Sequence, residues 1–173
     1  HNFKLVDKSY EILFIDYYKK ITITKGDTTI GRWNTSLKWY KKFLKEYGYS
    51  ELLTLADVER EKKISSDYAE FLVKQPIKDI TANGYLKTFS ALLNQAIRDE
   101  LIDRNPSKHI SIEVQETKKE FLTLEELKRL EVTECPRMQI RNAFLFSCYS
   151  GLRLSDIREV KFSDIEEINS ITE

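Results

Sequence analysis

The chain has 173 residues, and its 28 lysines and arginines balance its 28 aspartates and glutamates. This length suits one domain or two small ones, and the zero net charge gives no bulk basicity that would indicate nucleic-acid binding, although a balanced total can hide a basic face. Only five glycines and three prolines occur, so the composition favours helices over a β-sandwich or a disordered chain.

The two cysteines, Cys135 and Cys148, do not have the spacings of a disulfide framework, which favours a reduced, intracellular setting. No signal peptide and no apolar run of about 18 residues occur, so we expect a soluble, cytoplasmic protein without a membrane partner. The sequence predicts no metal site and no cofactor. It starts without an initiator methionine and stops at "DIEEINSITE" without a closing element, which suggests a fragment of a longer protein.

The first two predicted elements are amphipathic helices. Residues 5–21 place apolar side chains roughly at helical spacing, and Gly26 breaks the pattern. Thr28 or Thr29 can cap a second helix, which Gly48 ends at the C′ position. The apolar stripe of this second helix steps by three and four residues and consists of Ile30, Trp33, Leu37, Tyr40, Leu44 and Tyr47.

Two more helices are predicted before the composition changes. Asp57 can cap a third helix over about residues 57–74. The fourth opens near Asp79 or Thr81 and extends to about Leu101. Its apolar stripe consists of Leu86, Phe89, Leu93, Ala96 and Ile97.

The next segment, residues 105–122, is polar and only weakly alternating, which is typical of an extended interdomain linker. Thr123 then opens a helix with a capping-box pattern, because Glu126 follows three residues later. Another helix begins near Arg137 and ends at Gly151. Its apolar side chains, expected to lie in a core, include Ala143, Phe144, Phe146 and Cys148. A short amphipathic helix is predicted from Leu154 to about Val160.

The stretch "FLFSCYSGLRLSDI" ends an apolar helix with Gly151, Arg153 and Asp156. A glycine can take the positive φ that ends a helix, which places Arg153 at a tight junction between two helices. The planar guanidinium matches two phosphate oxygens, and free N–H groups at a helix start favour anions. Asp156 lies one turn further and could orient the guanidinium. A bare G-x-R also fits a plain helix end, where Arg153 only bonds carbonyls or pairs with Asp156.

The order of these features resembles the tyrosine recombinase (phage integrase) family, and most of all the integrases of mobile elements in Bacteroides-type bacteria. The catalytic domain of that family opens with a "yLT-x-eEl" helix, matched here by Leu122, Thr123, Glu125, Glu126 and Leu127. It continues to "TGLR-x-sDi-x-x-L", matched by Gly151, Leu152, Arg153, Ser155, Asp156 and Ile157. Ser150 in place of Thr and Val160 in place of Leu are mild departures.

The resemblance implies an all-α chain in three parts. Residues 1–104 would be a four-helix, SAM-like core-binding domain, residues 105–122 the linker, and residues 123–173 the first helices of a truncated catalytic domain. Members of the family cut and rejoin DNA through a tyrosine that attacks the scissile phosphate, without metal or ATP.

By match, Arg153 would be the first of the two catalytic arginines of the family, and Asp156 a supporting residue. The family's β-strand Lys, H-x-x-R pair, later His or Trp and nucleophilic Tyr are not found in these 173 residues. The parent protein would therefore be a DNA strand transferase, whereas this chain is predicted not to cleave DNA.

The resemblance also implies a clamp around duplex DNA, in which two helices cross the major groove. Residues 25–50 hold six Lys/Arg against two acids, so this stretch is locally basic. The candidate DNA contacts are Arg32, Lys38, Lys42 and Lys45 on the second helix, Asn83, Lys87 and Asn94 on the fourth, and Lys118 and Lys119 in the linker. Other recombinase protomers in a synaptic complex are the second expected partner.

Two alternatives remain open on the sequence alone. Lysines spaced by three and four residues are commonly a solvated helix face, so the chain could be a helical protein-interaction module in which Arg153 is only a cap. It could also be a non-catalytic regulator that binds DNA with its second and fourth helices.

Overall fold

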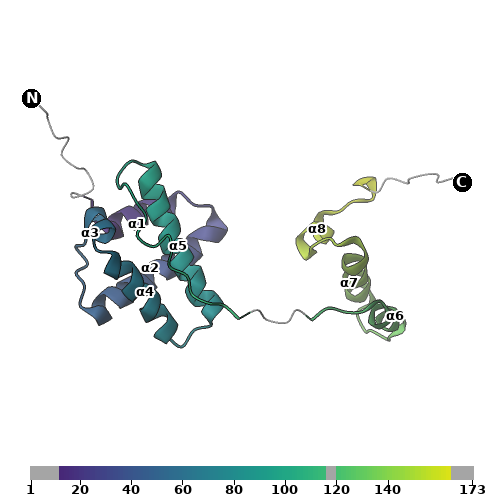
Figure 1. The fold of residues 1–173 in the computed structure, drawn as a ribbon. Coiled ribbons are helices and arrows are strands. Elements are labelled where there is room, and N and C mark those ends of the chain that lie inside the picture. Colours follow the sequence, from purple (N-terminus) through teal and green to yellow (C-terminus); the bar gives the residue numbers. More distant parts are fainter. Residues whose placement is uncertain (1–11, 116–119, 165–173) are drawn as a thin grey trace, which may run out of the picture. The chain divides into compact units, whose positions relative to one another are not determined.

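The computed structural model describes residues 12–115 and 120–164, apart from the side chain of Phe162. Two compact units are present, one within residues 1–116 and the other within residues 117–173 (Figure 1). Over the described ranges the chain forms α-helices and no strand beyond one isolated bridge, which confirms the all-α prediction. In those ranges no helix is both long and apolar enough to cross a membrane.

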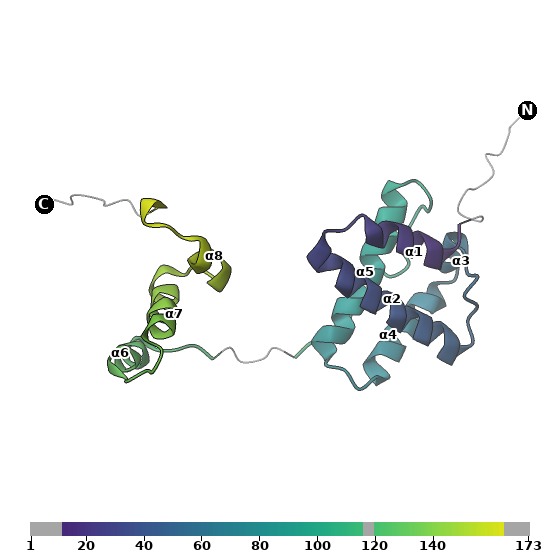
Figure 2. The same ribbon diagram turned by 180° about the vertical axis from the view of Figure 1, so that it is seen from behind.

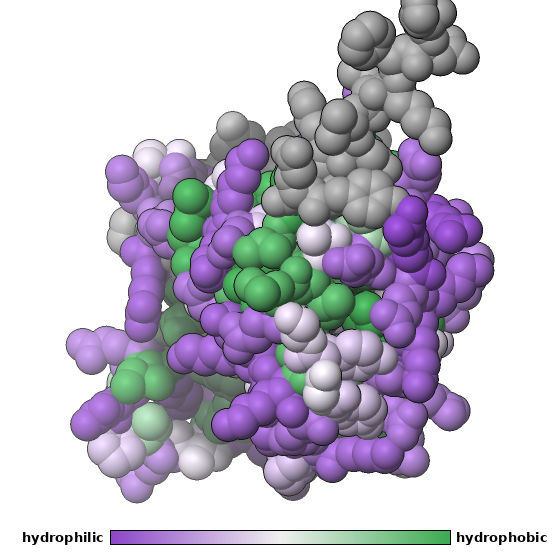
Figure 3. Space-filling model, turned by 90° about the vertical axis from the view of Figure 1, so that its left-hand side faces the viewer, coloured by the Kyte–Doolittle hydropathy of each residue, from purple (hydrophilic) through white to green (hydrophobic). Residues whose placement is uncertain are grey.

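The N-terminal unit is a bundle in which a short helix lies at one edge of four longer ones (Figures 1 and 2). Its helices are α1 (Phe14–Ile23), α2 (Asp27–Tyr47), α3 (Leu55–Arg60), α4 (Lys62–Lys74) and α5 (Asp79–Arg98). An isolated antiparallel bridge between Leu13 and Thr54 joins the segments that precede α1 and α3. On the face shown in Figure 3, hydrophilic side chains surround a smaller hydrophobic area.

The core of this unit is built from the predicted apolar stripes, with aromatic rings at its centre. Trp33, Leu37, Tyr40 and Leu44 of α2 are all buried, as the periodicity predicts. The Tyr40 ring centroid lies 4.9 Å from that of Phe14 on α1 and 5.4 Å from that of Phe89 on α5. Each such pair contributes about 0.5–1.5 kcal/mol beyond area burial, so these rings fix how the three helices cross.

The start of α2 differs from the prediction, whereas its end agrees with it. The helix begins at Asp27 with Gly26 as its N-cap, so the prediction that Thr28 or Thr29 caps it is wrong. Asp27 accounts for the earlier start, because a carboxylate in the first turn interacts favourably with the positive end of the helix dipole. Gly48 ends the helix with a φ of 73°, in the left-handed region that glycine adopts without steric cost.

The single helix predicted over residues 57–74 is two helices, α3 and α4, which meet at Glu61. The predicted cap, Asp57, is instead the third residue of α3, and Thr54 is the N-cap. Asp57 N–H donates to Thr54 Oγ1 at 3.1 Å, and Thr54 N–H donates to Asp57 Oδ2 at 2.8 Å. A continuous helix would align Glu61 with the buried Val58 and Ser65 at i, i+3 and i+7. Breaking the helix leaves the Glu61 carboxylate exposed and avoids the cost of burying it unpaired.

Beyond α5 the chain folds back onto the bundle. Leu101 N–H donates to the carbonyl of Ala96 at 2.9 Å, and Glu100 takes a φ of 55°, which ends the helix by a Schellman-type turn before the predicted Leu101. Ile102, Ser107 and Ile112 are then buried. The beginning of the segment assigned to the linker therefore packs against the N-terminal unit.

The C-terminal unit consists of α6 (Leu124–Val132), α7 (Met138–Ser150), α8 (Leu154–Glu159) and the short 3-10 helix η2 (Phe162–Asp164). The predicted capping box is present, since Thr123 N–H donates to Glu126 Oε2 at 2.8 Å and Glu126 N–H donates to Thr123 Oγ1 at 3.3 Å. Gly151 ends α7 with a φ of 72°, as predicted.

The interior of this unit is small. Among its described hydrophobic side chains only Leu127 and Leu145 are buried. Phe144 and Phe146 are 45% and 40% exposed, and Cys148 is exposed as well, so the expectation that these side chains fill a core is wrong. The physical reason is that two short helices, α6 and α8, cover only part of the surface of α7.

Candidate nucleic-acid interface

The outward face of α2 carries the proposed basic contacts. Arg32, Lys38, Lys42 and Lys45 are all exposed, because they lie away from the stripe that is buried in the bundle. Lys38 and Lys45 have no hydrogen bond or ion pair to any described residue. Their ammonium groups are therefore available to an anion.

Lys42 differs from its neighbours because it is held by the protein itself. Its Nζ donates to Gln75 Oε1 at 2.7 Å and lies 3.5 Å from a carboxylate oxygen of Glu46. The same ammonium sits over the Trp39 ring, 5.0 Å from its centroid. These contacts join α2 to the residue that follows α4, so Lys42 has a structural role in the bundle.

Arg32 brings the face of α2 against α5. Its Nη2 donates to the carbonyl of Gly84 at 3.4 Å, and a Cβ at Gly84 would lie 3.6 Å from the same nitrogen. Nearby on α5, Asn83 is partly exposed and Lys87 is exposed without a hydrogen bond or ion pair to any described residue. The Arg32 contact therefore brings the exposed face of α2 against α5 at Gly84, which lies between Asn83 and Lys87 in the sequence.

Asn94 lies further along α5 and is used by the fold. Its Oδ1 accepts a hydrogen bond from Asn105 Nδ2 at 2.8 Å, which ties the returning loop to the helix. One of its polar groups is thus already engaged. The last two candidates, Lys118 and Lys119, lie outside the described residues.

Arg153 lies at the junction between α7 and α8, as the glycine motif predicts. It is the exposed N-cap of α8 with extended backbone, φ −76° and ψ 161°. Its backbone N–H donates to Asp156 Oδ2 at 3.1 Å, and its guanidinium has no hydrogen bond or ion pair to any described residue. Asp156 therefore fixes the backbone of Arg153 rather than its side chain, and the guanidinium stays open to solvent.

The sequence did not predict one group of basic residues. Lys62 of α4 and Arg104, Lys108 and His109 of the returning loop line a pocket of about 660 Å³. The signal was the stretch "DRNPSKH", in which three basic residues surround Asn-Pro, but its polar composition led to a linker assignment. In the described ranges, no group of three or more His, Cys, Asp or Glu side chains could hold a metal ion.

Comparison with known proteins gives one match. The sequence model of the phage integrase SAM-like domain matches residues 13–113, a range that spans α1 to α5 and the loop after them. Searches of curated proteins and of solved structures found no match. Because the matched range covers more than half of the 173 residues, the chain belongs to the phage integrase SAM-like domain family, and its N-terminal unit is a DNA-binding module of the integrase type.

Proposed function

We propose that this chain binds duplex DNA through the exposed faces of α2 and α5, as part of a site-specific tyrosine recombinase of a mobile element. The observation that carries the proposal is the Arg32–Gly84 contact, at 3.4 Å, because it joins the two candidate faces into one surface. Lys38, Lys45 and Lys87 on these faces have no hydrogen bond or ion pair to any described residue. The family membership of residues 13–113 supports the same reading.

The side chains on this surface suit two kinds of contact. Lysine and arginine neutralise backbone phosphates and release condensed counterions, which gives affinity with little dependence on sequence. The amide of Asn83 can bond the edge of an adenine in the major groove. We therefore assign positioning on the duplex to the lysines and Arg32, and base discrimination to Asn83.

We assign to Arg153 the role of the first catalytic arginine of the recombinase. During attack by a tyrosine, negative charge grows on the non-bridging oxygens of the scissile phosphate, and a pre-positioned guanidinium stabilises it. Two features support this role: the guanidinium is exposed and unpaired within the described residues, and Asp156 holds the backbone beside it at 3.1 Å. Asp156 is then a positioning residue.

The test is a salt titration of duplex binding by the 173-residue chain, followed by fluorescence anisotropy. The logarithm of the affinity should fall linearly with the logarithm of salt concentration, and Lys38→Ala/Lys45→Ala should reduce the steepness of that line by about 2. The matched control is Lys19→Ala/Lys74→Ala, since these lysines already pair with Asp16 and Glu70. Binding that does not change with salt, or an equal loss in both variants, would refute the proposal.

A further inference from the structure

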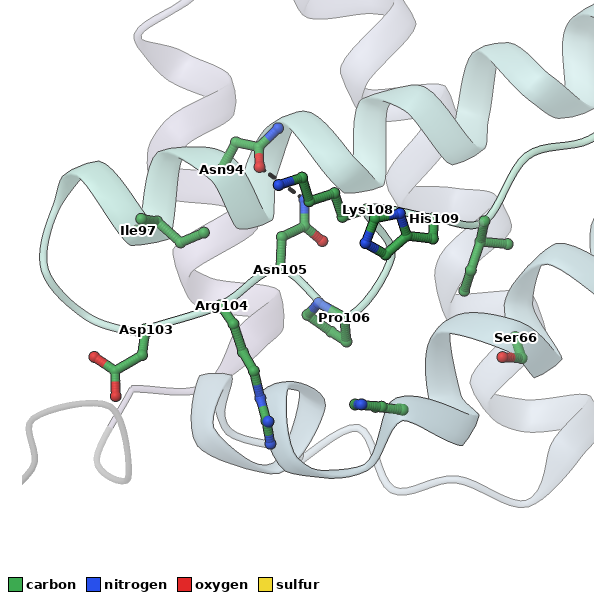
Figure 4. Close-up of a pocket in the computed structure, with 11 residues that line it drawn as sticks. Ser66, Asn94, Ile97, Asp103, Arg104, Asn105, Pro106, Lys108 and His109 are labelled. Carbon is green, nitrogen blue, oxygen red and sulfur yellow. Dashed lines mark hydrogen bonds between the residues drawn. The ribbon is translucent and has the colours of Figure 1, made fainter.

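The pocket between the N-terminal half of α4 and the loop after α5 is the feature that carries a further inference. Its volume is about 660 Å³, which lies within the range of small-ligand sites, roughly 300–1,000 Å³. Figure 4 shows the loop residues Arg104, Pro106, Lys108 and His109 and, on a separate helix, Ser66 of α4; the Lys108 side chain extends toward Asn94 and the Arg104 side chain extends away from it. The site lies wholly within the N-terminal unit.

Basic side chains outnumber acidic ones in the lining of this pocket. Lys62, Arg104 and Lys108 line it, and none of the three has a hydrogen bond or ion pair from its side chain to a described residue. The one acidic residue in the lining is Asp103, whose carboxylate points away from the other labelled side chains in Figure 4. Cations gathered around a concave surface raise the local concentration of anions.

The loop that carries these cations is held rigidly. Asn105 Nδ2 donates to the Ser90 carbonyl at 3.1 Å and to Asn94 Oδ1 at 2.8 Å, while Asn105 Oδ1 accepts from Ser107 Oγ at 2.7 Å. Glu59 Oε1 accepts the backbone N–H groups of Asp103 and Arg104, both at 2.8 Å. A site held in this way does not have to order its backbone when it binds.

We propose that this pocket binds a phosphate group, with Arg104 as the bidentate donor and Lys62 as a point charge, while Lys108, whose side chain extends toward Asn94 in Figure 4, adds to the positive potential of the lining. A guanidinium fork matches two oxygens of a phosphate, and ammonium groups complete the neutralisation. Ile97, Pro106 and Ile110 add apolar walls, which suit the C–H groups of a deoxyribose or the face of a base. The ligand class is therefore a nucleotide phosphate.

Two sources can supply that phosphate: the backbone of bound DNA or a free mononucleotide. We favour the DNA backbone, and this choice rests on the proposed function. Lys62 and Gln75 mark opposite ends of α4, so about 20 Å of helix separates the pocket from the Lys42–Gln75 contact. The pocket would then contact the duplex at a second point, apart from the α2 lysines.

The experiment compares Arg104→Ala/Lys108→Ala with Arg98→Ala/Lys63→Ala in the 173-residue chain. The control pair removes the same charges from exposed positions that do not line the pocket. Duplex binding is measured by anisotropy across salt, and AMP and inorganic phosphate are titrated while the amide resonances of Asn105 and His109 are followed by NMR. Unchanged amide spectra elsewhere show that each variant is folded.

A loss of duplex affinity of 10-fold or more in the pocket variant alone, with a less steep salt dependence, supports the site with DNA as its source. Saturable shifts of the Asn105 and His109 amides with AMP, absent in the pocket variant, support it with a mononucleotide as its source. The pocket proposal is overturned if neither effect occurs. Because Lys38→Ala/Lys45→Ala can still weaken duplex binding in that case, failure of the pocket is distinguishable from failure of the proposed function.

Discussion

The ammonium of Lys42 donates a hydrogen bond to Gln75 Oε1 at 2.7 Å and lies over the ring of Trp39. This contact joins the middle of α2 to the residue that follows α4. The lysines on the exposed face of α2 look equivalent in the sequence, but they differ in whether the fold engages them. Lys42 is engaged by the fold, whereas Lys38 and Lys45 have no described partner.

Replacing Lys42 by Ala should therefore lower the free energy of unfolding by about 1 kcal/mol, through loss of a charged hydrogen bond and a cation–π contact. Lys38→Ala should change it by less than about 0.5 kcal/mol and should weaken DNA binding more. Urea unfolding followed by the fluorescence of Trp33 and Trp39 measures the first effect, and anisotropy measures the second. Equal stability of the two variants would show that the contacts of Lys42 with Gln75, Trp39 and Glu46 make no net contribution to stability.

The glycine that ends α2 and a glycine inside α2 should respond to alanine in opposite ways. Gly48 has a φ of 73°, so Gly48→Ala should destabilise the chain by about 1 kcal/mol although open space surrounds the position. Gly31 lies inside the same helix, and its Cβ would also meet nothing within 4 Å. Gly31→Ala should stabilise the chain by about 0.5–1 kcal/mol. Thermal unfolding of both variants is the measurement, and shifts of the same sign would contradict the backbone explanation.

The hydrogen bond from Tyr17 to Asp99 should make stability depend on acid pH. The Tyr17 hydroxyl lies 2.7 Å from Asp99 Oδ2, and this bond, followed by the one from Gln95, lowers the pKa of the Asp99 carboxyl below its ordinary value. A lowered folded-state pKa stabilises the fold above the unfolded-state pKa, and that contribution is lost as the pH falls through the folded-state value.

Tyr17→Phe should thus raise the pKa of Asp99 and destabilise the chain at pH 7, and the difference in stability from the wild type should narrow as the pH falls below the ordinary aspartate pKa of about 3.9. The carboxyl resonance of Asp99 in an NMR titration reports its pKa. Urea unfolding midpoints at pH 7 and at acid pH report stability. Gln95→Ala should move the Asp99 pKa in the same direction by less. A stability difference that is constant across pH would contradict the linkage.

The 173-residue chain should bind duplex DNA without forming a covalent adduct. The H-x-x-R pair of the recombinase family is absent, since neither His1 nor His109 has an arginine three residues later. Incubation with a nicked duplex, followed by denaturing electrophoresis, should show free DNA only. A band of protein linked to DNA would mean that one of the nine tyrosines is a competent nucleophile.

Much of the N-terminal unit could be predicted from its sequence, because hydrophobic periodicity and glycine placement act locally. The stripe of α2 and its end at Gly48 are of this kind. No glycine or proline marks the break between α3 and α4 at Glu61. The break depends on tertiary packing, because Val58 of α3 and Ser65 of α4 are both buried in the folded bundle. A charged residue in register with an apolar stripe was the available signal.

The candidate site was harder to predict for a related reason. The lysines of α2 were located by their distance from the apolar stripe, yet only the folded structure shows that Gln75 engages Lys42. The basic pocket brings together Lys62 and Arg104, which are far apart in the chain. Side chains that are joined only by tertiary packing leave no periodic pattern in the sequence.

The hydrogen bonds of the Asn105 side chain determine how a pulling force on the chain reaches the bundle. The Asn105 amide donates hydrogen bonds to Ser90 and Asn94, and Ile112 is buried seven residues later. Tension applied to the chain beyond residue 115 would act on these contacts before it reached the last turn of α5. Force transmitted from a neighbouring domain would therefore tend to turn the bundle as a rigid body rather than unwind its longest helices.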